Sequence, residues 1–266
     1  MKKIIFVVLF VCLGAGLFAQ NGVDLSLGFQ YGTARIFDKG NTIRQIDEPG
    51  VLLSVRVYPG TIGFAGRIGL LFPSSVTEWG VTLDSQDFDY MLFINAGLCI
   101  SGIIPMNDRF AFLFDAGLSI NDLTYGGSYR DTIDASWTIR LENMGAPMTM
   151  SGGHKFENIR MKESYNDFSL GIIGNAAVRL NFTRRVYIEL GAAASFDFWR
   201  IKTFEFSADL LSGSNSWPDN AKEVFPADKL DDPNNPKKLI LSSDDKGSTF
   251  KHFTFIPSLS IGFSFK

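Results

Sequence analysis

Apolar and polar side chains alternate strictly in eight separate segments, and this alternation limits the fold more than any other feature of the sequence. The segments are residues 23–34, 51–59, 62–72, 88–101, 110–121, 167–182, 186–199 and 252–265. Successive side chains of a β-strand point to opposite faces, so a period of two predicts strands with two different faces. The sequence therefore predicts an all-β protein.

The two faces of these predicted strands differ sharply in chemistry. In segment 110–121, Phe110, Phe112 and Phe114 fall on one face and Asp115 on the other, and no segment has a charged residue on its apolar face. Phenylalanine gathers near the strand ends, with aliphatic and small residues between. Aromatic residues at both ends of a strand are typical of the two interfaces of a membrane. We expect the apolar face to contact lipid rather than a protein core.

The predicted connections alternate between short and long. Residues 58–61, 102–109 and 181–185 are short, whereas residues 35–50, 73–87, 122–166 and 200–251 are long. An up-and-down barrel would place all long connections at one end, as outer-membrane barrels do. Each segment is also long enough to cross a bilayer as a tilted strand, which takes roughly 9–11 residues. The fold predicted is an eight-stranded antiparallel up-and-down transmembrane β-barrel with four long extracellular loops.

The N-terminus predicts export. Two lysines precede an uncharged apolar run from Ile4 to Phe18, followed by Ala19, which is the pattern of a Sec signal peptide. We assign residues 1–19 to the signal peptide and residues 20–266 to the barrel domain. Removing the leader changes 25 basic residues to 23 against 28 acidic ones, a formal net charge of −5. This balance gives no support to a nucleic-acid partner. Only Cys99 remains, so an internal disulfide is excluded.

The last predicted strand carries a family resemblance. Its alternating apolar residues are Phe253, Phe255, Leu259, Ile261, Phe263 and Phe265. This segment resembles the closing strand of bacterial outer-membrane proteins, which the barrel-assembly machinery reads. It departs in ending with Lys266 and in containing Pro257, where we expect a local bulge. With the leader and the alternation, the chain resembles the small eight-stranded outer-membrane barrels. The resemblance implies the outer membrane of a diderm bacterium, with lipids, the Sec translocon and the assembly machinery as partners.

Eight strands leave an interior that side chains can fill, so the polar face predicts a packed lumen. We expect a self-neutralising charge network there because unpaired charges in such an enclosure cost several kcal/mol. Its predicted members are Arg56, Arg67, Asp115, Arg179 and Glu189. The alternative is that these groups line a constriction that conducts ions.

A second polar cluster is predicted at the outer mouth, where Asp89, Asp167, Asp197 and His252 should face inward. A histidine beside carboxylates can act as a general base. The sequence places no serine or cysteine beside it, and the acidic pairs of the last loop lack the spacing of a calcium loop. We therefore predict no catalytic, cofactor or metal site.

The function predicted is that of a non-enzymatic integral outer-membrane protein whose surface loops contact the environment. Adhesion, binding of an unknown extracellular ligand, and support of the envelope all fit. Three alternatives stay open. They are a narrow pore for ions or small solutes, a lipid- or peptide-modifying enzyme at the rim, and a soluble lipocalin-like barrel, which would need the phenylalanine-rich face inside.

Overall fold

The computed structural model describes residues 22–38, 41–58, 61–78, 81–150, 154–211, 219–246 and 251–265. The predicted signal peptide lies outside these residues. No helix in the described ranges is long and apolar enough to cross a membrane.

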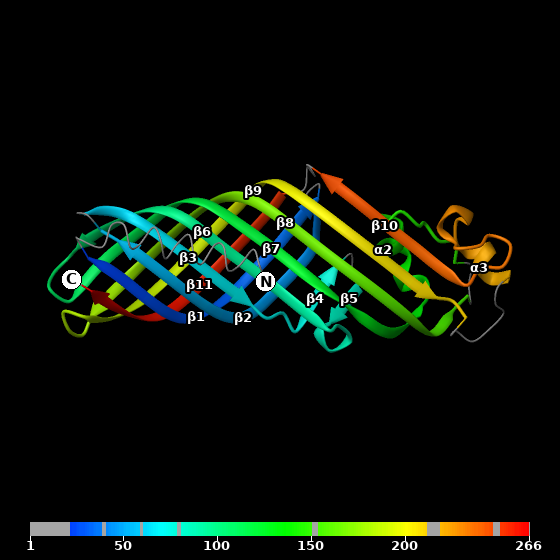
Figure 1. Cartoon of the computed structure of the whole chain (residues 1–266), viewed down its shortest axis with the longest axis horizontal. Helices are drawn as coiled ribbons and strands as arrows, with labels where there is room; N and C mark the ends of the chain where they lie inside the picture. The colour runs from blue at the N-terminus through cyan, green and yellow to red at the C-terminus, as the bar shows by residue number, and fades with distance from the viewer. Residues whose placement is uncertain are drawn as a thin grey trace.

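Eight strands form a closed antiparallel ring (Figure 1). They are β1 (Val23–Asp38), β2 (Asn41–Val57), β3 (Ile62–Leu71), β6 (Tyr90–Pro105), β7 (Phe110–Ile133), β8 (Phe156–Asn181), β9 (Val186–Asp209) and β11 (Lys251–Phe265). β1 pairs with β2 on one side and with β11 on the other, which closes the ring. The predicted eight-stranded up-and-down barrel is confirmed.

Pro257 does not produce a bulge in the ladder between β11 and β9, where it lies opposite Ala192 in unbroken register. Instead the ladder between β11 and β1 is interrupted, because no pairs form between Gln30–Ser258 and Thr33–Phe255. The proline lacks a backbone N–H to donate across that side. The ring nevertheless closes above and below the interruption.

The apolar face of the barrel points outward. On β9, Leu190 is 64% exposed whereas its neighbour Glu189 is 4% exposed. Large aromatic side chains are exposed at both ends of the barrel wall: Phe29, Tyr31, Phe72, Tyr90, Phe198 and Trp199 toward the long connections, and Phe110, Phe182, Phe263 and Phe265 toward the short turns. The phenylalanine-bearing face thus points outward, with aromatic residues at both ends, as contact with a membrane would require.

The predicted long connections all lie at one end of the barrel, and the structure shows that strands run through much of them. β1 and β2 continue through most of residues 35–50 as a hairpin. In 73–87, β4 (Ser75–Glu78) and β5 (Val81–Asp84) pair with each other, and the 3-10 helix η1 (Ser85–Asp87) follows. β7 and β8 extend across much of 122–166, and β9 pairs with β10 (Lys238–Lys246) inside 200–251.

The extended strands form a folded extracellular body, which we call the hood. It comprises residues 122–133 of β7, 156–167 of β8, 201–209 of β9, and β10, with the connections between them (Figure 1). Its helices are η2 (Ala135–Trp137), α2 (Thr138–Asn143), α3 (Asp219–Val224) and η3 (Ala227–Lys229). At about 3.3 Å per residue, the 12 residues of β8 in the hood rise roughly 40 Å along the strand.

The hood has a hydrophobic core of its own. Strands and helices both contribute to it, with Tyr125, Trp137, Leu141, Met161, Tyr165, Phe204, Phe206, Val224 and Phe225 among its buried side chains. The same cluster includes Leu71 and Phe93, which come from the upper ends of the barrel strands β3 and β6. The apolar core of the hood therefore lies directly on the mouth of the barrel.

The polarity of the two sheet faces reverses where the barrel becomes the hood. On β8, Leu170 and Ile172 point outward, but Met161 and Tyr165 point inward. β9 makes the same change with a β-bulge: Leu170 pairs with Trp199 and Gly171 with Asp197, so Phe198 is an extra residue. One extra residue turns every later side chain to the opposite face.

Candidate functional site

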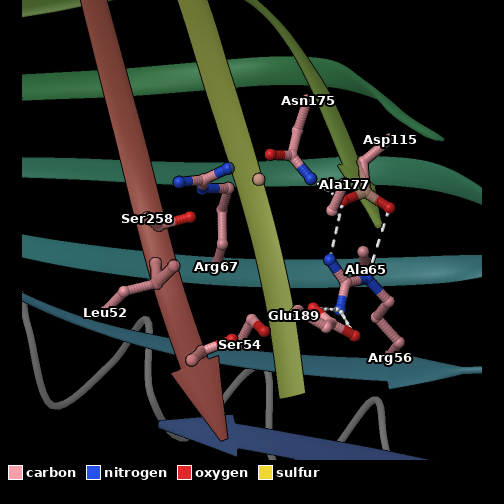
Figure 2. A pocket seen from close by; sticks show the side chains of 12 residues that line it. Leu52, Ser54, Arg56, Ala65, Arg67, Asp115, Asn175, Ala177, Glu189 and Ser258 are labelled. Atoms are coloured by element: carbon pink, nitrogen blue, oxygen red, sulfur yellow. Dashed lines mark hydrogen bonds and ion pairs between the residues drawn. The ribbon is translucent and has the colours of Figure 1, made fainter. Parts of the chain in front are cut away.

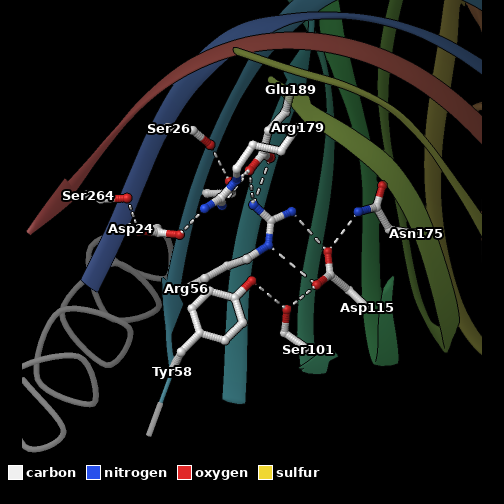
Figure 3. A network of polar contacts seen from close by, with 11 residues as sticks. Asp24, Ser26, Arg56, Tyr58, Ser101, Asp115, Asn175, Arg179, Glu189 and Ser264 are labelled. Carbon is white, nitrogen blue, oxygen red and sulfur yellow. Dashed lines mark hydrogen bonds and ion pairs between the residues drawn. The ribbon is translucent and has the colours of Figure 1, made fainter. Parts of the chain in front are cut away.

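Arg56 occupies the centre of a charge network that crosses the lower lumen (Figure 3). Its Nη1 donates to Oε2 of Glu189 at 2.8 Å, and its Nη2 donates to Oδ2 of Asp115 at 3.0 Å. Asp115 also accepts hydrogen bonds from Ser101 Oγ at 2.5 Å and Asn175 Nδ2 at 2.7 Å. All of these side chains are buried. One guanidinium thus links carboxylates on β7 and β9.

Arg179 extends this network to the seam of the barrel. Its Nη2 donates to Oε1 of Glu189 at 2.6 Å and its Nη1 to Oδ2 of Asp24 at 2.5 Å. Asp24 on β1 accepts a further bond from Ser264 Oγ on β11 at 2.6 Å. The guanidinium also lies 3.8 Å above the centre of the Tyr187 ring. The network includes Asp24, whose role the sequence did not indicate.

Arg67 differs from the expectation. It is buried in the lumen at 5% exposure, but its Nε and Nη2 have no hydrogen-bond partner in the described part of the chain. Asp115, another member of the predicted network, is paired with Arg56. Four of the five predicted network residues are joined by ion pairs, whereas Arg67 forms none with the residues that the structure describes.

The predicted cluster at the mouth does not form a single site. Asp197 accepts from Asn121 Nδ2 at 2.8 Å and from Ser169, and Asp167 is paired with Arg200. Asp89 is exposed because the strand starts at Tyr90, one residue beyond it. His252 lies opposite Asp197 in register, but its side chain is outside the described part.

Arg200 is a site residue that alternation alone could not identify. A strict period of two from Glu189 and Asp197 would put Trp199 inside and Arg200 outside. The bulge at Phe198 reverses this, so Arg200 is buried and pairs with Asp167 while Trp199 is exposed. The hint in the sequence is that Arg200 directly follows the aromatic residues Phe196, Phe198 and Trp199, all of which point outward.

The hood contains a buried ion pair. Arg140 on α2 donates from Nη2 to Oε1 of Glu163 on β8 at 2.5 Å. The hydroxyl of Tyr125 donates to Oε1, and that of Tyr129 to Oε2, each at 3.1 Å. Burial and the Glu163 charge raise the pKa of Tyr129 well above its usual value. This pair fastens the α2 segment to the sheet.

The predicted assembly signal lies on the outward face of β11. All six of its residues are exposed between 41% and 60%: Phe253, Phe255, Leu259, Ile261, Phe263 and Phe265. Among the residues that the structure describes, no three histidine, cysteine or acidic side chains are grouped so as to hold a metal ion.

No protein-family model and no curated protein matches this sequence. Solved structures do match over most of the chain. Ail of Yersinia pestis has 11% identity, with 92% of this chain and 99% of that chain covered, and a TM-score of 0.41. Neisserial surface protein A has 11% identity, coverage of 92% and 96%, and a TM-score of 0.43. A major outer membrane protein of Thermus thermophilus has 10% identity, coverage of 91% and 99%, and a TM-score of 0.43.

At these identities and TM-scores, the class of this chain rests on its own structure. The ring of eight antiparallel strands is closed, its outer wall is apolar with aromatic residues at both ends, and its lumen is polar. Long connections lie at one end and tight turns at the other. By these features the chain has the fold of a small, eight-stranded outer-membrane β-barrel protein.

Proposed function

We propose that the protein is a non-enzymatic outer-membrane barrel that presents the hood outside the cell, where it binds a ligand. The observation that carries this proposal is the hydrophobic core of the hood together with its buried Arg140–Glu163 pair. A body of this kind keeps its outer surface in a fixed shape. A preformed surface loses less conformational entropy on binding than a loop that must first become ordered.

The filled lumen supports a role at the surface over a role in transport. Arg56 and Arg179 connect groups on five of the barrel strands, and the apolar core of the hood lies over the mouth. The cavity next to Arg56 has room for about one water molecule.

The arrangement of the carboxylates supports a non-enzymatic role. Asp167 and Asp197, expected at the mouth, are both buried and hydrogen-bonded to neighbouring side chains. Asp115 and Glu189 are likewise held by arginines in the lumen. A general base needs to reach the proton it removes, and carboxylates engaged in this way are badly placed for that.

The outward face of the hood favours an anionic ligand. Arg130 on β7 lies directly opposite Arg160 on β8, and Lys162 follows two residues later on the same face. All three are exposed, and none forms an ion pair within the described residues. Like charges directly opposite on paired strands are unfavourable, so an anion bound across them would relieve their repulsion.

Binding of dextran sulfate to cells that display the full chain tests this function. The matched variant is Arg130→Ser/Arg160→Ser, which changes only the exposed face. We expect the wild-type chain to bind with an affinity that falls as salt is raised, and the variant to bind at least tenfold more weakly. Equal binding by both would refute the anionic surface. A Lys222→Ser variant serves as the control, since that exposed lysine lies on α3 and not in the row of paired strand positions that carries Arg130 and Arg160.

A further inference from the structure

Three exposed arginines lie in neighbouring turns at the tight-turn end of the barrel. Arg109 ends the turn between β6 and β7, and Arg184 and Arg185 lie in the turn between β8 and β9. The two turns are side by side, because the backbone N–H of Asn181 donates to the carbonyl oxygen of Arg109 at 2.7 Å. None of the three arginines forms an ion pair with any residue that the structure describes. Their charges are therefore available to a ligand.

A side chain holds the backbone of each turn in one shape. Oδ1 of Asn107 accepts a hydrogen bond from the backbone N–H of Arg109 at 2.8 Å, and Oγ1 of Thr183 accepts one from that of Arg185 at 3.1 Å. The carbonyl oxygen of Arg185 accepts a further bond from the backbone N–H of Ser264 on β11 at 2.8 Å. Such local side-chain contacts stabilise tight turns. The backbone that carries the arginines is thus ordered before any ligand binds.

The charges of the lumen do not offset those of the turns. The lumen above these turns holds three buried arginines and three buried carboxylates, a formal sum of zero: Arg56, Arg67, Arg179, Asp24, Asp115 and Glu189. Figure 2 shows four of them around one small cavity. Asp108 is the only acidic residue in the sequence of the two turns, 106–109 and 182–185. Three arginines against one aspartate leave these turns a formal charge of +2.

The arginines lie at the depth of lipid headgroups. Phe110 and Phe182 point outward at this rim of the barrel and are 41% and 60% exposed. Arg109 directly precedes Phe110, and Arg184 follows Phe182 by two residues, which span at most roughly 7 Å of extended chain. A bilayer of about 40–45 Å with a hydrocarbon core of about 30 Å leaves roughly 5–8 Å on each side for headgroups. Guanidinium groups that start at the aromatic belt can therefore contact lipid phosphates.

We propose that these two turns bind the phosphate of an anionic phospholipid in the adjacent leaflet, which for outer-membrane barrels is the periplasmic one. The guanidinium group suits phosphate oxygens, because it can donate two parallel hydrogen bonds to them. The net positive charge of the turns repels the cationic group of a zwitterionic lipid, so the site prefers phosphatidylglycerol to phosphatidylcholine. The remaining tight turn, Tyr58 to Thr61, has no charged residue in its sequence. The binding surface therefore lies on one side of the barrel, at the end opposite the hood.

Native mass spectrometry of the full chain in a non-ionic detergent tests this preference, with phosphatidylglycerol and phosphatidylcholine added separately. We expect the wild-type chain to bind phosphatidylglycerol at least about tenfold more tightly. Each basic residue near an anionic lipid surface contributes about fivefold to the affinity. In Arg109→Gln/Arg184→Gln, which leaves Arg185 in place, the affinity for phosphatidylglycerol should fall roughly 25-fold. Equal affinity of the wild-type chain for the two lipids overturns the proposal, and this outcome requires no variant to fold.

A variant matched in charge separates the turns from the rest of the surface. Lys222→Gln/Lys237→Gln removes the same formal charge from two exposed lysines in the hood connections, and it should bind phosphatidylglycerol as the wild-type chain does. The same loss of affinity in both double variants would show that binding follows net charge alone, and would overturn the proposal. An excess of inorganic phosphate should leave the lipid bound, because its acyl chains also contact the aromatic belt. Displacement of the lipid by inorganic phosphate would instead assign the turns to a free anion and overturn the lipid site.

Discussion

Removing the charge of Arg140 should loosen the hood while the barrel stays closed. Arg140→Met keeps an aliphatic side chain but removes the guanidinium, whose carbon lies 4.9 Å from the centre of the Trp137 ring. Glu163, which is 1% exposed, then loses its ion pair with Arg140. Breaking a buried ion pair by removing one partner costs roughly 3–5 kcal/mol. The hydroxyls of Tyr125 and Tyr129 still donate to the carboxylate, so we expect the lower end, about 3 kcal/mol. At 1.36 kcal/mol per factor of ten, this is a roughly hundredfold increase in local opening.

Amide hydrogen exchange in detergent measures this opening within a single strand. Residues 156–165 of β8 belong to the hood, and residues 171–179 of the same strand belong to the barrel. We expect the first group to exchange about a hundred times faster in Arg140→Met and the second group to be unchanged. In Arg140→Met/Glu163→Gln neither position of this pair carries a charge, so most of the protection should return. The reasoning is refuted if the single variant exchanges less than fivefold faster or if the double variant exchanges as fast as the single.

Three further predictions concern the wall, the lumen and the pH response. Leu190→Arg, in the outward wall, should destabilise the inserted barrel by about 2–4 kcal/mol in urea titrations in lipid vesicles; Leu190→Phe should be close to neutral, and an equal effect of the two would mean that this face does not contact lipid. The wild-type chain should pass no steady current in a planar bilayer, and a steady conductance that changes in Arg67→Ala would contradict a closed lumen. Because the folded pKa of Tyr129 is raised, the stability it contributes is complete below its unfolded pKa of about 10 and is lost as the pH rises above that value. Hood exchange should therefore accelerate above pH 10, and Tyr129→Phe should weaken this dependence.

The barrel could be predicted because lipid and lumen impose opposite demands on alternate residues. Phe112, Phe114 and Leu190 point outward, and Asp115 and Glu189 point toward the barrel axis. Apolar and polar residues therefore alternate along the sequence with a period of two. The tight turns follow from the same pattern, since they are where the alternation stops over a few residues. Each of these features is local and needs no knowledge of distant contacts.

The hood could not be read in the same way, because its apolar residues change phase. Along β7 they lie at even positions up to Ile120 and at odd positions from Leu123 and Tyr125 onward. Such a break resembles the end of a strand, although the backbone continues unchanged. On β9 the apolar positions keep their phase through Phe204, and it is the bulge that turns them inward. A change of phase without turn residues is the signal that would have revealed the longer strands.

The charge network shows a second limit of sequence reasoning. Counting from the turns places Arg67 and Asp115 at similar depth, and both are in the lumen. Which arginine takes Asp115 depends on side-chain directions across the barrel, and there Arg56 has the shorter approach. Depth follows from position in the strand, whereas partner choice follows from packing in three dimensions.

The reversal of polarity between barrel and hood fixes the depth at which the protein is inserted in its membrane. If the chain sank by a few residues, Asn166 and Thr203 would leave water for hydrocarbon. If it rose by the same distance, Leu170 and Ile172 would leave hydrocarbon for water. Both displacements cost free energy. The depth of the protein in the membrane is therefore set by the change of polarity on β7, β8 and β9, rather than by the turns or the termini.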